Sequence, residues 1–304
     1  MTRALILAAA FFAAAGTKST IPRTADGHPD LQGTWDNATV TPLERPKEFA
    51  DKPYFTEAEA ADFVAHGLDR FIAARGEVEL KVNGEINGIW SGPARVGPSL
   101  RTSIVIDPPD GRLPPLTPET QARMQARIAE RREHPFDNPE DLTLGERCLM
   151  WGAGPPMMPV PQNSNLQIVQ TRDHVLFMTE MVHEARIVPM DARPPLPPAI
   201  RRMTGDSRGR WDGDTLVVET TNFTAKTELR GTTAERHVVE RFTMTNADTI
   251  QYRFTVDDSA AFTRPWTGEV YLVRTIDRIF EYACHEANYS MALILQGARA
   301  EDKR

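Results

Sequence analysis

The stretch GRWDGDTLVVETTNF, residues 209–223, carries the clearest folding signal in the chain. Asp212 and Gly213 separate two runs of apolar and β-branched residues, an arrangement that is typical of a tight β-hairpin. The stretch HVVERFTMTNADTIQYRFTVDD, residues 237–258, repeats this pattern around a turn at residues 246–248. Successive hairpins with no helix between them predict an antiparallel sheet.

Strand patterns also fill most of the chain around these hairpins. Residues 165–190 predict a hairpin that turns at residues 172–173, followed by one long strand that runs on to Val188. Residues 267–284 predict the last two strands, and residues 31–36 (LQGTWD) predict a short early one. We therefore expect an all-β fold with minor helix, built as an antiparallel up-and-down β-barrel with a lipocalin-like interior, because closure removes exposed sheet edges. A two-sheet sandwich is the alternative.

Two peripheral helices are predicted outside this barrel. The first spans residues 55–76, where Thr56 and Glu59 form a capping box. The second spans residues 118–133, directly after the N-cap residue Thr117. A further short helix is expected at the C-terminus.

The N-terminus has the three parts of a secretory signal. Arg3 supplies the positive charge, residues 4–15 form an apolar stretch, and small residues allow cleavage near Ala15 and Gly16. The apolar stretch is too short to span a bilayer, and no later stretch is longer. We therefore expect a periplasmic or secreted protein without a membrane span. A buried N-terminal helix is the alternative interpretation.

The predicted domain organisation has three parts. Residues 1–16 form the signal peptide, residues 17–53 an extended arm, and residues 54–304 a single β-barrel domain with helical insertions. The formal charge of −7 and the lack of basic runs argue against nucleic acid as a partner. The sequence leaves the oligomeric state open.

The chain contains two cysteines, Cys148 and Cys284. In an oxidising compartment, two cysteines and no third predict one disulfide between them. Two buried free thiols are the alternative.

Several phrases, taken together, resemble a large family of exported and mostly uncharacterised bacterial proteins. The phrases are RTADGHPDLQGTWDN, IDPPDGRLPPLTPE, GDSRGRWDGDTLVVETTNF, VVERFTMTNADTIQYRFTVDD, RPWTGEV and EYACHEANY. The resemblance covers nearly all of the chain after the signal sequence and implies a lipocalin-like β-barrel. It also points to cofactor-free breakdown of plant-derived aromatic compounds among relatives.

The first candidate site lies on the predicted long strand, residues 177–188. Strand alternation places His183 on the same face as Phe177, which we expect to point inward. A histidine in a dry cavity can act as general acid or base near neutral pH. A core histidine bonded to a backbone carbonyl is the alternative. Glu184 and Arg186 fall on the opposite face and are expected to form surface ion pairs.

The second candidate site lies on the strand that starts at His237. Its alternation places Glu240 among apolar neighbours and puts His237 and Arg241 on the other, polar face. An inward Glu240 needs an arginine partner, because a lone buried carboxylate has a raised pKa and stays neutral. A raised carboxylate suits general acid or base catalysis, and a structural salt bridge is the alternative.

The third candidate site is EYACHEANYS, residues 281–290. Alternation predicts that Phe280, Tyr282 and Cys284 face the core, with Glu281 and His285 on the opposite face. Three strand histidines, His183, His237 and His285, could converge on zinc, but no local spacing matches a zinc motif.

From these patterns we predict an enzyme with no organic cofactor and no metal. It is a lyase or isomerase that uses side-chain acid–base chemistry on a small, fairly apolar substrate, of which plant-derived aromatic molecules are one class. The alternative is a non-catalytic periplasmic, lipocalin-like binder of an apolar small molecule. The predicted catalytic residues are His183, Glu240, Arg241 and His285. The predicted binding residues are Arg186, His237, Asn222 and Glu281.

Overall fold

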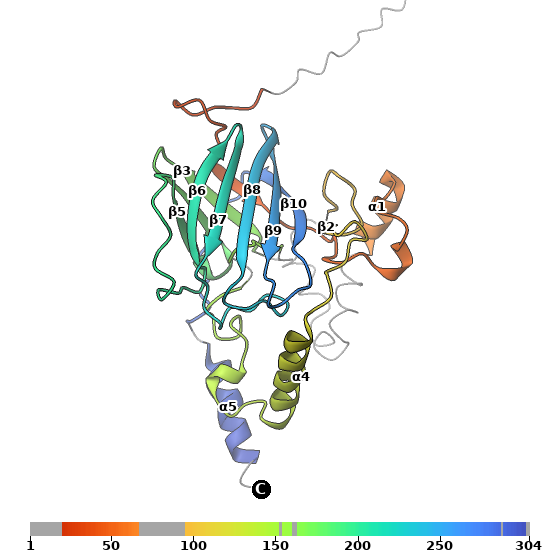
Figure 1. Ribbon diagram of the computed structural model, residues 1–304, viewed down its shortest axis with the longest axis vertical. Helices are drawn as coiled ribbons and strands as arrows, with labels where there is room; N and C mark the ends of the chain where they lie inside the picture. The colour runs from red at the N-terminus through yellow and green to blue at the C-terminus, as the bar shows by residue number, and fades with distance from the viewer. Residues whose placement is uncertain (1–19, 67–94, 152–153, 160–162, 287, 302–304) are drawn as a thin grey trace, which may run out of the picture.

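A ten-stranded antiparallel sheet dominates the computed structural model, which describes residues 20–66, 95–151, 154–159, 163–286 and 288–301 (Figure 1). The strands are β1 (Gly33–Asp36), β2 (Val105–Asp107), β3 (Asn165–Gln170), β4 (His174–Thr179), β5 (Ala185–Pro189), β6 (Asp206–Asp212), β7 (Thr215–Thr221), β8 (His237–Asn246), β9 (Thr249–Asp257) and β10 (Trp266–Thr275). The helices are α1 (Glu57–Ala65), α4 (Pro118–Glu133) and α5 (Tyr289–Glu301), with short 3₁₀ turns η1 (Lys47–Phe49), η2 (Pro139–Asp141) and η3 (Met181–His183). The all-β class with minor helix is confirmed.

The strand order differs from that of a simple up-and-down barrel. It runs β5-β4-β3-β1-β10-β9-β8-β7-β6, with β2 paired to β10 beside this path. The early strand β1 therefore lies between β3 and β10, where Trp35 is opposite both Leu166 and Arg274. All pairings along the path are antiparallel, so strand direction alternates from one strand to the next. Because the path contains nine strands, its first and last strands, β5 and β6, run in the same direction.

The two ends of this path are not joined. Within the described residues no backbone pairing joins β5 to β6, so the sheet is rolled but not closed into the barrel that the sequence predicted. The two edges still touch through side chains. Gly209 of β6 has no side chain, and the side chains of Val188 of β5 and of Met190 fill the space beside it. A Cβ atom added at Gly209 would lie only 2.9 Å from the Val188 side chain. We call the line between β5 and β6 the seam; residues 190–205, rich in proline, connect its two strands.

Aromatic side chains fill the inside of the rolled sheet. Phe177, Phe242, Tyr252, Phe254 and Trp266 form a chain of ring contacts with centroids 4.8 to 5.7 Å apart. All five are buried, as the alternating pattern of their strands predicts. The centre therefore holds packed rings, and a ligand site has to be sought at the edge of the sheet.

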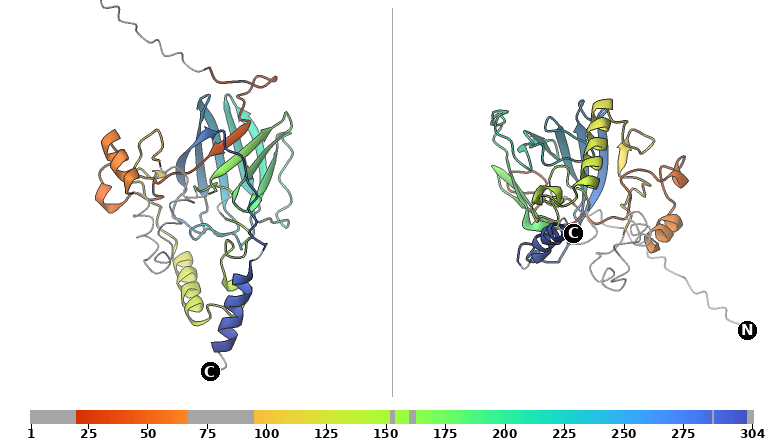
Figure 2. Two further views of the ribbon diagram at one scale, coloured as in Figure 1. Left: turned by 180° about the vertical axis from the view of Figure 1, so that it is seen from behind. Right: turned by 90° about the horizontal axis from the view of Figure 1, so that it is seen from below.

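The helices lie outside the sheet (Figures 1 and 2). Thr56 caps α1 in a capping box with Glu59, and Thr117 caps α4, as predicted. Helices α4 and α5 project below the sheet, and α5 has no buried residue. Every helix within the described residues is too short or too polar to cross a bilayer. The predicted signal peptide, residues 1–16, and the rest of the first predicted helix, residues 67–76, lie outside the described residues.

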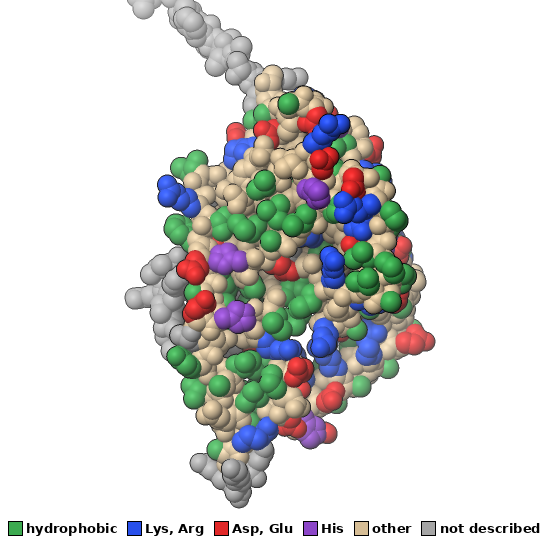
Figure 3. All heavy atoms as spheres, turned by 90° about the vertical axis from the view of Figure 1, so that its left-hand side faces the viewer, with side chains coloured by type: hydrophobic (Ala, Val, Ile, Leu, Met, Phe, Trp, Pro, Cys, Tyr) green, Lys and Arg blue, Asp and Glu red, His purple; other side chains and the backbone are tan. Residues whose placement is uncertain are grey.

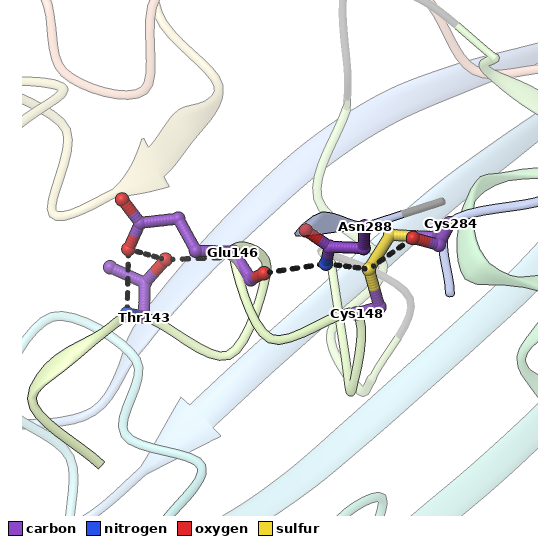
Figure 4. Close-up of a disulfide and its surroundings, with 5 residues drawn as sticks. All are labelled: Thr143, Glu146, Cys148, Cys284 and Asn288. Atoms are coloured by element: carbon purple, nitrogen blue, oxygen red, sulfur yellow. Dashed lines mark hydrogen bonds between the residues drawn. A yellow bond between two sulfur atoms is a disulfide. The ribbon is translucent and has the colours of Figure 1, made fainter. Parts of the chain in front are cut away.

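The predicted disulfide is confirmed. Cys148 and Cys284 are joined, with their Cα atoms 5.7 Å apart (Figure 4). The Asn288 side chain contacts both the carbonyl of Glu146 and the sulfur of Cys148, at 3.4 and 3.2 Å. The bond fixes the loop before β3 to the segment after β10.

The predicted long strand through residues 177–188 is wrong, because the chain reverses at residues 180–184. The turn η3 places Val182 and His183 at φ of 63° and 50°, a left-handed conformation that these residues seldom adopt. The reversal pairs β4 with β5, so that Phe177 lies opposite Arg186. Arg186 is consequently buried on the core side, the reverse of the surface position that the uninterrupted strand predicted.

Candidate functional site

A buried ion pair lies at the inner face of the seam. Arg186 is 5% exposed and Glu240 is fully buried. The guanidinium binds both carboxylate oxygens, with 3.0 Å between Nη2 and Oε1. Tyr252 donates its hydroxyl hydrogen to the same Oε1 at 2.7 Å and accepts a hydrogen bond from the Met157 amide at 2.9 Å. The prediction that an inward Glu240 needs an arginine partner is confirmed.

The electrostatics keep Arg186 and Tyr252 each in one protonation state near neutral pH. Burial alone would lower the pKa of Arg186, but the Glu240 carboxylate outweighs it and the net direction is upward. Burial, followed by the charge of Glu240, raises the pKa of Tyr252 well above its ordinary value. Arg186 therefore stays charged, and Tyr252 stays a hydrogen-bond donor.

Glu184 lies two residues before Arg186, on the same side of the chain. Burial raises the pKa of its carboxyl to about 7, although the positive charge of Arg186 opposes the shift. Glu184 Oε2 and Arg186 Nε are both buried, and neither has a hydrogen-bond partner among the described residues. One is an acceptor when ionised and the other is a donor, so the pair is suited to a bound polar group.

A cleft of about 320 Å³ opens along the seam and reaches Arg186. Its lining comes from β5, the proline-rich connection and β6: Ala185, Arg186, Ile187, Pro189, Arg193, Leu196, Arg202, Thr204, Gly205, Asp206, Ser207 and Arg208. Figure 3 views the molecule from the side of β5 and β6, where Lys and Arg side chains gather around the middle of the face. We call this feature the seam cleft.

The local sequence explains how the seam cleft keeps its shape. Asp206 accepts from Arg208 at 2.8 Å and from the Leu196 amide at 2.8 Å, which fixes the connection against β6. Asn222, at φ of 57°, donates to the Leu196 carbonyl at 2.8 Å. A predicted binding residue, Asn222, thus holds the wall of the seam cleft without being part of its lining.

His183 lies elsewhere, on the exposed turn between β4 and β5. Its Nε2 is 2.8 Å from the carbonyl oxygen of Phe280 and 3.1 Å from the amide nitrogen of Tyr282. A protonated Nε2 donates to the Phe280 carbonyl, and an unprotonated Nε2 accepts from the Tyr282 amide. His183 therefore binds the segment that follows β10 in either tautomer. His183 and Glu281 also line a broad, shallow hollow of about 650 Å³, in which Phe280 is 65% exposed.

The remaining predicted residues point away from the seam cleft. His237 and Arg241 lie on the outer face of β8, near Glu219 at 3.6 Å and Asp212 at 2.8 Å respectively. Strand β10 ends at Thr275, so the core-facing strand predicted for residues 279–286 is wrong. His285 is exposed. The structure thus brings together Arg186 and Glu240, and leaves the other predicted catalytic residues apart.

The described residues contain no group of three His, Cys, Asp or Glu side chains that could hold a metal ion, so the three histidines do not converge. The sequence interpretation missed Glu184, Arg202 and Asp206. Glu184 was missed because the turn at η3 carries no glycine or asparagine to mark it. No protein-family model and no curated protein sequence matches the chain.

Glu184 makes the stability of the protein depend on pH. The unfolded carboxyl releases its proton near its ordinary pKa of 4.5, whereas the folded one holds it until about pH 7. Between these values the folded state binds more protons, so stability falls as the pH rises. We expect Glu184→Gln to remove this loss of stability. The loss is on the order of 2 kcal/mol, which is less than the full pKa shift implies, because water reaches part of the side chain and screens the effect. Urea unfolding of both proteins at pH 5 and pH 8 measures it; parallel pH profiles would contradict the assignment.

Proposed function

We propose that the protein is a cofactor-independent lyase or isomerase that moves a proton on a small, fairly apolar substrate in the seam cleft. The observation that supports this proposal is a cleft lined by a buried arginine whose Nε has no partner among the described residues. Buried polar groups are normally hydrogen-bonded, and exceptions are found at functional sites. Aromatic rings fill the sheet interior, and at the seam a cleft brings a small molecule within reach of buried charge.

Glu184 is the acid–base residue in this proposal. It is not itself part of the cleft lining, but it directly precedes Ala185 and Arg186, which are, and its carboxyl interacts electrostatically with Arg186. A carboxyl with a pKa of about 7 is divided between its two protonation states at neutral pH, the condition that favours general acid–base catalysis. Such a group typically contributes about 10² to 10⁴ in rate. Arg186 stabilises negative charge that develops on the substrate, through Nε. Glu240 and Tyr252 are positioning residues. Glu240 holds the two Nη nitrogens of Arg186, Tyr252 holds Glu240, and neither lines the cleft.

These roles differ from those predicted from the sequence. His183, Arg241 and His285 take no part, because each lies away from Arg186. His183 binds the segment after β10, Arg241 lies on the outer face of β8 and His285 is exposed. A non-catalytic binder of an apolar small molecule would use the same cleft without Glu184. Product formation therefore separates the two functions.

We also infer that the protein works in an oxidising compartment, as a periplasmic or secreted protein. The disulfide supports this, because such bonds persist outside the reducing cytosol. The charged, apolar and small-residue regions of residues 1–16 support export in the same way. The resemblance to exported proteins with relatives active on plant-derived aromatic compounds makes such compounds the first substrates to try.

The experiment is a thermal-shift screen of the oxidised protein against aromatic dimers, sterols, fatty acids and keto-sugars, with product analysis of every hit. We expect at least one hit to be consumed by the wild type and spared by Glu184→Gln. His285→Ala, an exposed position outside the seam cleft, is the matched control and should keep full activity. Equal turnover by Glu184→Gln would overturn the catalytic role, and stabilisation without any product would favour the binder.

A further inference from the structure

The cations that line the seam cleft differ in whether an anion already neutralises them. Arg186 is paired with Glu240, Arg208 with Asp206, and Arg193 with Asp191. The fourth, Arg202, is exposed and forms no ion pair with a carboxylate of the described residues. The lining therefore has one positive charge that is available to a ligand.

The chain fixes the backbone of Arg202, and none of the described residues binds its guanidinium. Its amide donates to the Asn222 carbonyl at 2.9 Å, and its own carbonyl accepts from the Thr224 amide at 2.9 Å. Two backbone hydrogen bonds thus hold Arg202 at the start of the segment that leads into β6. No side-chain hydrogen bond of Arg202 occurs within the described part of the chain, so its five donors can bind a ligand.

Apolar side chains form the rest of the wall. Ile187, Pro189 and Leu196 line the same cleft, and Ile187 is 65% exposed although it is a large aliphatic residue. The volume of about 320 Å³ is at the lower end of the range for small-molecule sites, roughly 300 to 1,000 Å³. A compact ring or short chain therefore fits better than a long lipid.

We propose that the substrate of the seam cleft is a small apolar monocarboxylate, whose carboxylate is bound by Arg202 and whose apolar body lies against Ile187, Pro189 and Leu196. This inference rests on the proposed function, because it names the substrate class for the same site. Guanidinium and carboxylate match in planar geometry, which makes the pair specific as well as attractive. A monoanion fits better than a dianion, because the lining has only one uncompensated cation and Asp206 and Glu240 lie close by.

The test compares the binding of cinnamate and cinnamamide, which differ in charge but hardly in shape. We expect the wild type to bind cinnamate roughly tenfold more tightly than cinnamamide, with a preference that weakens as salt is raised. Arg202→Gln should remove the preference and leave the affinity for cinnamamide unchanged. Arg210→Gln is the matched control, because Arg210 lies on β6, the strand that follows Arg202, is exposed and pairs with Glu219 outside the cleft.

The outcomes separate this inference from the proposed function. Equal affinity for the two probes in the wild type, or a preference that survives Arg202→Gln, overturns the monocarboxylate assignment. If neutral aromatic hits are nevertheless consumed in a Glu184-dependent manner, the proposed enzyme stands. A cinnamate preference that depends on Arg202, found in a protein that consumes none of the screened compounds, supports the monocarboxylate as the ligand of the cleft and overturns the enzyme.

Discussion

Arg186→Met should lower the free energy of unfolding by about 3–5 kcal/mol, the largest effect that we expect from a single substitution. The variant leaves the Glu240 carboxylate fully buried with only the Tyr252 hydroxyl to stabilise it. Removing one partner of a buried ion pair costs about this much, because the remaining charge is left uncompensated. Urea unfolding at pH 7 measures the change.

Two further variants control for the loss of the arginine side chain itself. Arg186→Met combined with Glu240→Gln removes both charges and keeps an acceptor for Tyr252, so it should recover at least half of the lost stability. Arg210→Met breaks an exposed pair with Glu219 and should cost no more than about 1 kcal/mol. A single Arg186→Met variant within 1 kcal/mol of the wild type would show that the pair contributes little to the seam.

Replacing both cysteines with serine should lower the free energy of unfolding by about 2–5 kcal/mol. The Cys148–Cys284 bond spans 136 positions and encloses β3 to β10, so its loss frees a long loop in the unfolded chain. Urea unfolding of the oxidised wild type and of the double variant gives the difference.

Reduced wild-type protein is the control for this second prediction. It should unfold at the same urea concentration as the double serine variant, because both lack the cross-link. If the oxidised wild type and the variant differ by less than about 0.5 kcal/mol, the bond does not constrain the unfolded state as the loop length implies.

The local features of the fold could be read from the sequence. Residues close together in the sequence specify the Asp212-Gly213 turn and the N-caps Thr56 and Thr117. Residue type alone specifies the cysteine pair, because the chain has two cysteines. The sequence also predicted that a buried Glu240 needs a positively charged partner, because a buried carboxylate requires one whatever the fold.

The site itself depends on two features that no local pattern encodes. The left-handed Val182 and His183 reverse the chain without a glycine or asparagine signal, and this reversal moves Arg186 from the surface to the core. The insertion of β1 between β3 and β10 is a long-range pairing. It joins the two halves of the sheet into one path, whose end strands β5 and β6 form the seam and its cleft.

The position of β1 has a consequence for how the chain reaches its final form. Its partner β10 lies near the other end of the sequence, so the middle of the sheet joins two segments that emerge from the ribosome at very different times. The β3–β5 and β6–β9 meanders can each assemble early from neighbouring strands, but they share no hydrogen-bonded edge until β10 and β1 meet. Folding should therefore end with the joining of two preformed halves. A chain truncated before Trp266 should retain strand structure while lacking the central pairing that makes the halves one sheet.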